Sequence, residues 1–321
     1  KCIILLKLFV IYFLYRKEYM KVIGVIVNKN RDIALKYTSI LANNIAEMGA
    51  KVLLLRGIPE ELSLNESSSL NSFVELSNEK EIIDNAEIVI SLGGDGSFLK
   101  VARMAYEKDL PILGINLGSL GFLTEIEKDD IKSAVSNLLN GNYIVEKRMM
   151  LDGSIIRDGK VIANDTALND IVISRGALSK ILHLRAYLND EFVDMFPGDG
   201  LIVSSPTGST AYSLSAGGPI VEPNINLIIM SPICPHILYS RSIVTADDRI
   251  VKVVVDEDFA HEAMVTVDGQ EGYEIKGGDI IIIEKSKYKT NLVRINPLNF
   301  FDVLRMKIYF RGECVKRNEI Q

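Results

Sequence analysis

Hydrophobic residues in the first part of the chain alternate between short continuous runs and helical spacing. Four runs are almost wholly apolar, as in parallel strands buried on both faces: 22–27, 51–55, 88–92 and 111–115. Residues 33–48 carry apolar side chains at helical spacing and end at Gly49, which is typical of an amphipathic helix. This alternation predicts a doubly wound, Rossmann-like α/β domain over residues 20–142.

The pattern changes after residue 143 to short β-type runs separated by turn sequences. These turns are Asp158-Gly159, Asn189-Asp190 and Asp268-Gly269. Such spacing predicts an all-β, antiparallel, sandwich-like domain over residues 143–295, with helical character only around 207–217. Helical spacing returns at the end of the chain, so we expect residues 296–321 to form a helical tail that packs back on the first domain.

Two segments do not fit either domain. Residues 1–19 contain an apolar run that is too short to span a bilayer and has no small-residue cleavage site. We interpret them as an upstream extension before a start at Met20, with a weak membrane anchor as the alternative. Residues 58–78 are rich in Ser, Asn and Glu, which predicts a flexible surface segment, either a variable linker or a lid.

Composition and charge narrow the class of protein. The chain of 321 residues has 48% hydrophobic and 24% charged residues, as a globular protein does. Its net charge of −6, without a dense Lys/Arg tract, argues against nucleic acid as a partner. Cys2, Cys234 and Cys314 are widely spaced, which indicates a reducing cytoplasm and no zinc site. We expect a cytoplasmic protein with no membrane partner.

The most informative motif is Gly93-Gly94-Asp95-Gly96, which follows an apolar strand. Ligands of α/β sheets bind at the carboxyl ends of strands, and the free N–H groups of a following helix favour phosphate. A carboxylate repels phosphate unless it takes a proton or faces a metal or a hydroxyl, so Asp95 indicates chemistry. The alternative is an ordinary Asp-Gly turn.

Three further segments carry polar groups suited to a nucleotide. Residues 114–125 form a second glycine-rich turn after the next strand, which would give the Asp95 turn a facing wall. Asn169-Asp170 opens an apolar strand and offers donors and acceptors for ribose hydroxyls or an adenine edge, although an Asx turn explains it equally well. The hydroxyl-rich block 207–217 suits a planar or sugar-bearing ligand, with close helix packing as the alternative for Ala216 and Gly217. His236, in a loop broken by prolines, is more typical of a structural histidine.

Taken together, these motifs resemble the NAD kinase family, which phosphorylates the 2′-hydroxyl of the adenosine ribose of NAD. The resemblance covers almost the whole chain from Met20, and it implies a first domain like those of diacylglycerol kinases and phosphofructokinases. It implies that Asp95 is the proton acceptor. It also implies a set of residues that bind the substrate or nucleotide: Gly94, Gly96, Lys100, Asn169, Asp170, Lys180, Asp199, Thr210, Ala211, Tyr212, Ser215 and Gln270.

The resemblance assigns these residues separate tasks. Lys100 neutralises phosphate charge, Asn169 and Asp170 hold the adenosine part of NAD, and Asp199 holds the nicotinamide carboxamide. Adenine and ribose are bound by Thr210, Ala211, Tyr212 and Ser215. The family most often has Asn-Glu where this chain has Asn169-Asp170, so a hydrogen bond from the shorter carboxylate is expected to be longer or water-mediated.

The implied partners are NAD and a phosphoryl donor, either ATP or polyphosphate, with a divalent cation, Mg²⁺, on the donor phosphates; the metal ligands of the protein are unknown. A homodimer or homotetramer is expected from the family. The chain has neither a Walker loop nor a Gly-x-Gly-x-x-Gly fingerprint, so NAD would be a substrate held by a different architecture. The rival readings are a lipid or sugar kinase that shares the Gly-Gly-Asp-Gly motif and a non-catalytic nucleotide sensor.

Overall fold

The structure is a computed structural model that describes residues 21–32, 35–56, 73–176, 180–295 and 299–309. Its contacts divide the chain into two compact units. Unit 1 comprises Lys1–Val101, Leu110–Val145 and Leu292–Gln321, and unit 2 comprises Ala102–Asp109 and Glu146–Asn291. The predicted upstream extension, 1–19, lies outside the described residues.

Unit 1 is built on a parallel sheet whose strands run in the order β3-β2-β1-β4-β5. These strands are β1 (Val22–Val27), β2 (Lys51–Leu55), β3 (Val74–Ser77), β4 (Ile88–Gly93) and β5 (Pro111–Asn116), with the short β6 (Ile126–Glu127) beside β5. The prediction of a doubly wound domain is confirmed. The strand order reverses between β1 and β4, and such a switch point is where open α/β sheets bind their ligands.

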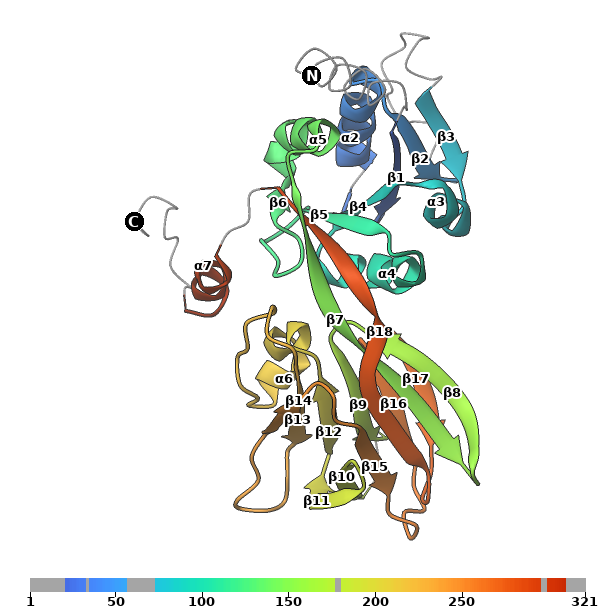
Figure 1. Cartoon of the computed structure of the whole chain (residues 1–321), viewed down its shortest axis with the longest axis vertical. Coiled ribbons are helices and arrows are strands. Elements are labelled where there is room, and N and C mark those ends of the chain that lie inside the picture. Colours follow the sequence, from blue (N-terminus) through green and yellow to red (C-terminus); the bar gives the residue numbers. More distant parts are fainter. Residues whose placement is uncertain (1–20, 33–34, 57–72, 177–179, 296–298, 310–321) are drawn as a thin grey trace, which may run out of the picture. The chain divides into compact units, whose positions relative to one another are not determined.

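Helices cover both faces of this sheet (Figure 1). They are α2 (Lys36–Glu47), α3 (Glu79–Asn85), α4 (Asp95–Ala105) and α5 (Ile131–Asn140). Apolar side chains of α2 and α5 share one hydrophobic core with alternate residues of β1, such as Ile23 and Val25. The opposite face of β1 meets α3, where a Cβ built on Gly24 would lie 2.5 Å from Ile82 Cγ2. The period-two alternation of β1 therefore places a helix against each face.

Local side-chain bonds fix where the helices begin. The buried Asp32 carboxylate accepts hydrogen bonds from Tyr37 N and Thr38 N at the start of α2. Asn78 and Glu81 form a reciprocal capping box that starts α3. The prediction of a flexible segment over 58–78 is wrong at its end, because residues 74–77 form β3. Residues 57–72 lie outside the described part of the chain.

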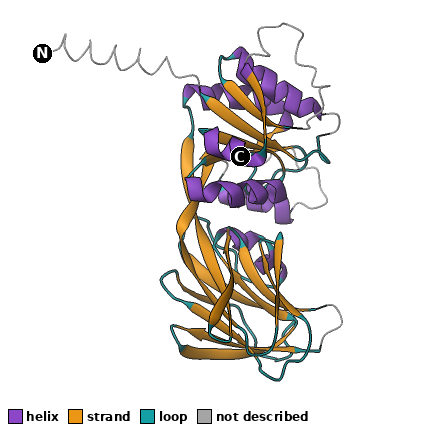
Figure 2. Ribbon diagram, turned by 90° about the vertical axis from the view of Figure 1, so that its right-hand side faces the viewer, coloured by secondary structure: helices purple, strands orange, loops and turns teal. Residues whose placement is uncertain are grey.

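Unit 2 consists of two layers of antiparallel strands that enclose a hydrophobic core (Figure 2). One sheet has the order β14-β13-β12-β9-β16-β17, and the strands β11-β10-β15-β18, with β7 and β8, form the other. Their bounds are β7 (Ile144–Arg157), β8 (Lys160–Ala167), β9 (Asp170–Arg175), β10 (Leu182–Leu188), β11 (Glu191–Gly198), β12 (Gly200–Ser204), β13 (Leu227–Ile233), β14 (Ile243–Ala246), β15 (Val251–Val255), β16 (Ala263–Val267), β17 (Glu271–Ile275) and β18 (Ile280–Arg294). The prediction of a sandwich-like β domain is confirmed.

The three predicted hairpin turns are present, and each places consecutive residues at positive φ. Asp158-Gly159 joins β7 to β8, Asn189-Asp190 joins β10 to β11, and Asp268-Gly269 joins β16 to β17. The 3-10 turn η5 (Thr207–Thr210) and the short helix α6 (Tyr212–Ser215) confirm helical character in the predicted block. Positive φ at both central residues matches the twist of the flanking strands.

The described residues of the predicted helical tail, 299–309, are helical from Phe300 onward, whereas residues 296–298 and 310–321 of that prediction lie outside the described part of the chain. The helical segment consists of α7 (Phe300–Leu304) and the π-helical turn η6 (Arg305–Tyr309). The Phe300 ring packs on Phe122 with 6.2 Å between the ring centroids. Among the residues described, none of the helices is both long and apolar enough to cross a membrane.

Candidate active site

The Asp95 turn lies at the switch point of the unit 1 sheet. Strand β4 ends at Gly93, and α4 begins at Asp95. The neighbouring carboxyl end of β1 is tied to this turn, because Asn28 N donates to Leu92 O at 3.0 Å and Asn28 Nδ2 donates to Ser97 Oγ at 3.1 Å. The motif that is strongest in sequence therefore occupies the position where α/β sheets bind ligands.

The Asp95 carboxylate is held by the segment that follows β5. Phe122 N donates to Oδ2 at 2.9 Å, whereas Leu123 N, Thr124 N and Thr124 Oγ1 all donate to Oδ1 at 3.0–3.2 Å. Within the described residues, Oδ1 thus has three hydrogen-bond donors and Oδ2 has one. The carboxylate is fixed in direction, and Oδ2 keeps lone-pair capacity for a further donor.

The loop that holds Asp95, residues 117–125, is itself well anchored. A Cβ built on Gly121 would lie 1.9 Å from Asp95 Oδ1, so only glycine fits there. Asn116 closes the loop by accepting from Gly118 N at 2.7 Å and donating to Thr124 Oγ1 at 3.0 Å. Since Gly93 pairs with Asn116 across β4 and β5, the two glycine-rich turns predicted to face each other are indeed neighbours.

Three cationic side chains lie on or near the Asp95 turn and the helix that follows it. Lys307 Nζ lies 3.8 Å from Asp95 Oδ2. The guanidinium of Arg31 is close to the glycine turn, since a Cβ on Gly94 would lie 3.1 Å from Arg31 Nη1. Lys100 forms an ion pair of 2.6 Å with Glu79 on α3. Sequence reasoning missed Lys307, because no local motif marks a lysine at the far end of the chain.

In unit 2, the Asn169-Asp170 turn is organised by Asp268. The Asp268 carboxylate accepts hydrogen bonds from Leu168 N, Asn169 N and Asp170 N at 2.7–3.2 Å. Asp268 N donates in return to Asp170 O at 3.0 Å. Sequence reasoning identified Asp268 only as a hairpin residue. Asp268 and Asn169 are far apart in the sequence. No local pattern therefore indicated that the turn between β16 and β17 binds the backbone at the start of β9.

Asp170 and Asp268 place two carboxyl groups close together. Asp170 is only 5% exposed, and this burial, together with the nearby Asp268 charge, raises its pKa to about 7. Burial also raises the pKa of Asp268, which the three backbone N–H donors partly oppose. A carboxyl group that is protonated part of the time at neutral pH both donates and accepts hydrogen bonds, which suits a ribose hydroxyl.

The hydroxyl-rich block contacts the same turn. Ser205 N donates to Asn169 O at 2.8 Å. Gly208 comes so close to this carbonyl that a Cβ built on Gly208 would lie 2.2 Å from Asn169 O. Ser204, Ser205 and Ser209 are fully buried, so these hydroxyls serve the fold. Unit 2 therefore places the start of the 207–217 block against the Asn169 carbonyl, and Tyr212, further along this block, is 46% exposed.

The remaining predicted residues of unit 2 lie at its surface. Asp199 accepts a 2.6 Å hydrogen bond from Arg175 Nε, and both side chains are about one-third exposed. Lys180 and Gln270 are exposed. The binding roles of these three residues stay predictions.

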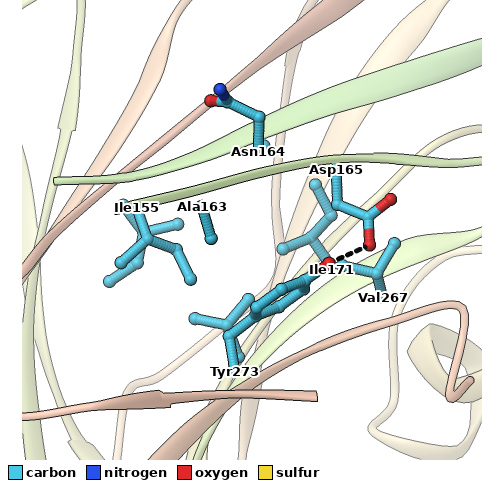
Figure 3. Close-up of a pocket in the computed structure, with 10 residues that line it drawn as sticks. Ile155, Ala163, Asn164, Asp165, Ile171, Val267 and Tyr273 are labelled. Carbon is cyan, nitrogen blue, oxygen red and sulfur yellow. Dashed lines mark hydrogen bonds between the residues drawn. The ribbon is translucent and has the colours of Figure 1, made fainter. Parts of the chain in front are cut away.

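A small pocket inside unit 2 lies elsewhere (Figure 3). Apolar side chains such as Ile155, Ile171 and Val267 line it, and Asp165 and Tyr273 join through a 2.7 Å hydrogen bond from Tyr273 Oη. Burial and this carboxylate raise the pKa of Tyr273. The pocket shares no residue with the predicted nucleotide-binding set.

Metal ligation by the protein has little basis in the described part of the chain. That part contains no cluster of three or more His, Cys, Asp or Glu side chains arranged to hold a metal ion. Asp95 Oδ2 is an oxygen of the type that Mg²⁺ prefers, but it is a single ligand.

Comparisons with known proteins agree with this arrangement. The family model described as the ATP-NAD kinase N-terminal domain matches residues 23–143, and that of the ATP-NAD kinase C-terminal domain matches residues 168–295. The NAD kinase of Acetivibrio thermocellus is 56% identical over 294 residues, which is 92% of this chain and 99% of that protein.

Two solved structures share the fold. The yeast NADH kinase complexed with NADH has a TM-score of 0.82 at 22% identity, covering 94% of this chain and 91% of that one. The NAD kinase from Archaeoglobus fulgidus in complex with ATP has a TM-score of 0.70 at 24% identity, covering 91% of this chain and 100% of that one. With both family models matched in order and a relative above half identity over nearly the full length, the chain belongs to the ATP-NAD kinase family.

Proposed function

We propose that this chain transfers a phosphoryl group to the 2′-hydroxyl of the adenosine ribose of NAD, with Asp95 Oδ2 as the acceptor of the hydroxyl proton. The observation that carries the proposal is the bonding of Asp95, in which Oδ1 is saturated by the 122–124 segment and Oδ2 accepts one N–H. A carboxylate fixed in direction with one available oxygen fits a proton acceptor.

Phosphorylation of the ribose hydroxyl requires few groups besides a proton acceptor. A ribose hydroxyl is a poor nucleophile unless its proton leaves during attack, and Asp95 supplies the acceptor. Phosphoryl transfer otherwise depends on alignment and charge neutralisation. Helix α4 begins at Asp95, and the helix dipole there favours negative charge such as that of a phosphate. Gly94 and Gly96 have no side chains to obstruct a phosphate there.

The turn in unit 2 is proposed to bind the adenosine part of NAD. Asn169 carries an amide that both donates and accepts, and Asp170, with its pKa raised to about 7, shares that ability near neutral pH. The Asp268 clamp fixes the backbone that carries both side chains. We propose that Thr210, Ala211, Tyr212 and Ser215 complete the adenine and ribose contacts, and that Asp199 binds the carboxamide.

The donor is proposed to be ATP, the nucleotide present in the Archaeoglobus fulgidus structure of the same fold. Polyphosphate is the other donor expected from the sequence. Mg²⁺ is proposed to arrive on the donor phosphates, with water as its main ligand. Bound there, the cation would neutralise phosphate charge.

The test is product formation by the purified chain. Incubation with NAD, ATP and Mg²⁺ should yield NADP, identified by chromatography and by its use in an NADP-specific dehydrogenase reaction. Parallel reactions with polyphosphate as donor separate the two donor classes. Binding of NAD measured by calorimetry, with no NADP from either donor, would instead favour a nucleotide sensor.

A further inference from the structure

The ammonium group of Lys307 lies beside the one oxygen of Asp95 that the loop leaves available. Its Nζ is 3.8 Å from Asp95 Oδ2, and the two side chains are 29% and 30% exposed. The same ammonium lies 5.0 Å from the centroid of the Phe122 ring. Because Phe122 N donates to Asp95 Oδ2, one residue of the loop both bonds the carboxylate and supports the cation.

The segment that carries Lys307 is placed by aromatic packing. Phe300 in α7 packs on Phe122, and Phe301 follows it with 5.3 Å between their ring centroids. Asn299 caps the first turn of α7 by accepting from Phe301 N at 2.9 Å. Lys307 therefore reaches Asp95 from an element with its own anchorage on the Asp95-binding loop.

Lys307 is not needed to orient Asp95. Three donors on Oδ1 and one on Oδ2 already fix the carboxylate, and a separation of 3.8 Å is too long for a hydrogen bond. What the ammonium adds is positive charge next to Oδ2. A nearby cation favours the ionised form of a carboxylate, whereas nearby phosphates disfavour it.

We propose that Lys307 acts on phosphoryl transfer through Asp95, because its positive charge beside Oδ2 offsets the negative charge of the donor phosphates while Asp95 accepts the ribose proton. This inference rests on the proposed function. Without Lys307, the negative charge of the donor would act on Asp95 uncompensated at that oxygen. The C-terminal helical segment is then part of the catalytic apparatus as well as of the fold.

The other two cations near the turn are less suited to this task. Lys100 is engaged with Glu79, and its side chain is 56% exposed. Arg31 is exposed, and its guanidinium lies near two glycines instead. Its Nη1 would be 3.1 Å from a Cβ built on Gly94 and 3.4 Å from one built on Gly118. Lys307 is the cation that the structure records within ion-pair distance of Asp95.

The experiment compares Lys307→Met and Lys307→Arg with a matched control, Arg305→Met. Arg305 is a cation on the same turn that pairs with Asp302 instead of Asp95. Each variant is assayed for kcat and for the KM of NAD and of ATP, and its melting temperature is recorded. We expect Lys307→Met to lower kcat by about 10- to 100-fold, the scale for loss of one preorganised charge, with the KM of NAD within about threefold.

Lys307→Arg should recover most of that loss, and Arg305→Met should keep the parent kcat. An active parent with an unchanged kcat in Lys307→Met would overturn this inference alone. Equal losses in Lys307→Met and Arg305→Met, with lowered melting temperatures and no rescue by arginine, would also overturn it, because they indicate a structural role. A parent that makes no NADP would defeat the proposed function and this inference with it.

Discussion

Asp95 in unit 1 and Asp170 in unit 2 are the same residue type in opposite surroundings. The Asp95 carboxylate receives four hydrogen bonds from residues 122–124 and has the Lys307 ammonium 3.8 Å away. Asp170 is buried beside a second carboxylate, that of Asp268, and its pKa is raised to about 7. Asp95 is surrounded by hydrogen-bond donors and a positive charge, whereas Asp170 is buried next to a negative charge.

The difference assigns different chemistry to each carboxyl group. Donors and cations stabilise a charged carboxylate, which is the form that accepts a proton. Burial beside a like charge favours the neutral form, which donates as well as accepts and so suits recognition of hydroxyl groups. Pairs of titratable groups in contrasting environments are a general sign of divided roles. Here the contrast matches the division proposed above, with proton transfer at Asp95 and substrate binding at Asp170.

Among variants that leave both carboxyl groups in place, the largest effect is expected from Gly121→Ala, which would displace the Asp95 carboxylate. The new Cβ would lie 1.9 Å from Asp95 Oδ1, so the carboxylate must move. Displacement of a catalytic group by an ångström costs on the order of 10- to 100-fold in kcat. Gly118→Ala is the matched control in the same loop, since its Cβ would lie at ordinary contact distances of 3.4 Å from Arg31 Nη1 and 3.7 Å from Asn116 Oδ1. Equal kcat values for the two variants would contradict the fixed-carboxylate account.

An intermediate effect, on stability, is expected from Asp170→Asn. Asp170 has a higher pKa when folded, about 7, than in the unfolded chain, where it is about 4. Between these values the unfolded chain releases the proton first, so the free energy of unfolding falls as pH rises from about 4 to about 7 and stays lowered above that. The amide variant removes this penalty and should raise the free energy of unfolding at pH 8 by about 1–4 kcal/mol.

Urea unfolding at pH 5 and pH 8, without NAD, measures this effect. The gain from Asp170→Asn should be larger at pH 8 than at pH 5. Asp129→Asn, which changes an exposed carboxylate on the 3-10 turn η4 (Lys128–Asp130), is the control and should shift both values equally. A variant that loses stability at pH 8 would show that the Asp170 carboxylate is stabilising when charged.

The smallest effect, on the KM of ATP, is expected from Lys100→Met. This variant tests whether Lys100 on α4 belongs to the Asp95 site. Lys100 is paired with Glu79, and their side chains are 56% and 39% exposed. Surface ion pairs of this kind contribute about 0–1 kcal/mol, and Lys100 would have to leave Glu79 to reach a phosphate. We expect the KM of ATP to stay within about threefold, as in the control Glu79→Gln. A selective tenfold rise in the KM of ATP for Lys100→Met would add Lys100 to the donor site.

The sequence predicted what depends on local pattern. The continuous apolar runs in the sequence correctly predicted β1, β2, β4 and β5, because a parallel strand covered on both faces consists mostly of apolar residues. The turn residues gave the hairpins at 158–159, 189–190 and 268–269, since positive φ favours Gly, Asn and Asp. The glycine turn around Asp95 was placed at the carboxyl end of its strand for the same reason.

The sequence could not show contacts between distant segments. Asp268 looked like a hairpin residue, and only the pairing of β9 with β16 brings its carboxylate under the 168–170 backbone. Lys307 lay in a tail with helical spacing, and its approach to Asp95 depends on the packing of Phe300 on Phe122. Strand β3 was missed because only one residue of Val74–Ser77 is fully buried, which leaves a weak apolar pattern.

The most direct test of the account is the single-turnover rate of NADP formation by Asp95→Asn, with NAD affinity measured separately by calorimetry. The amide oxygen still accepts hydrogen bonds from the loop but does not take up the ribose proton. The account predicts a rate at least about 100-fold below the parent, with a Kd for NAD within about threefold. A single-turnover rate equal to that of the parent would contradict the role of Asp95 as proton acceptor.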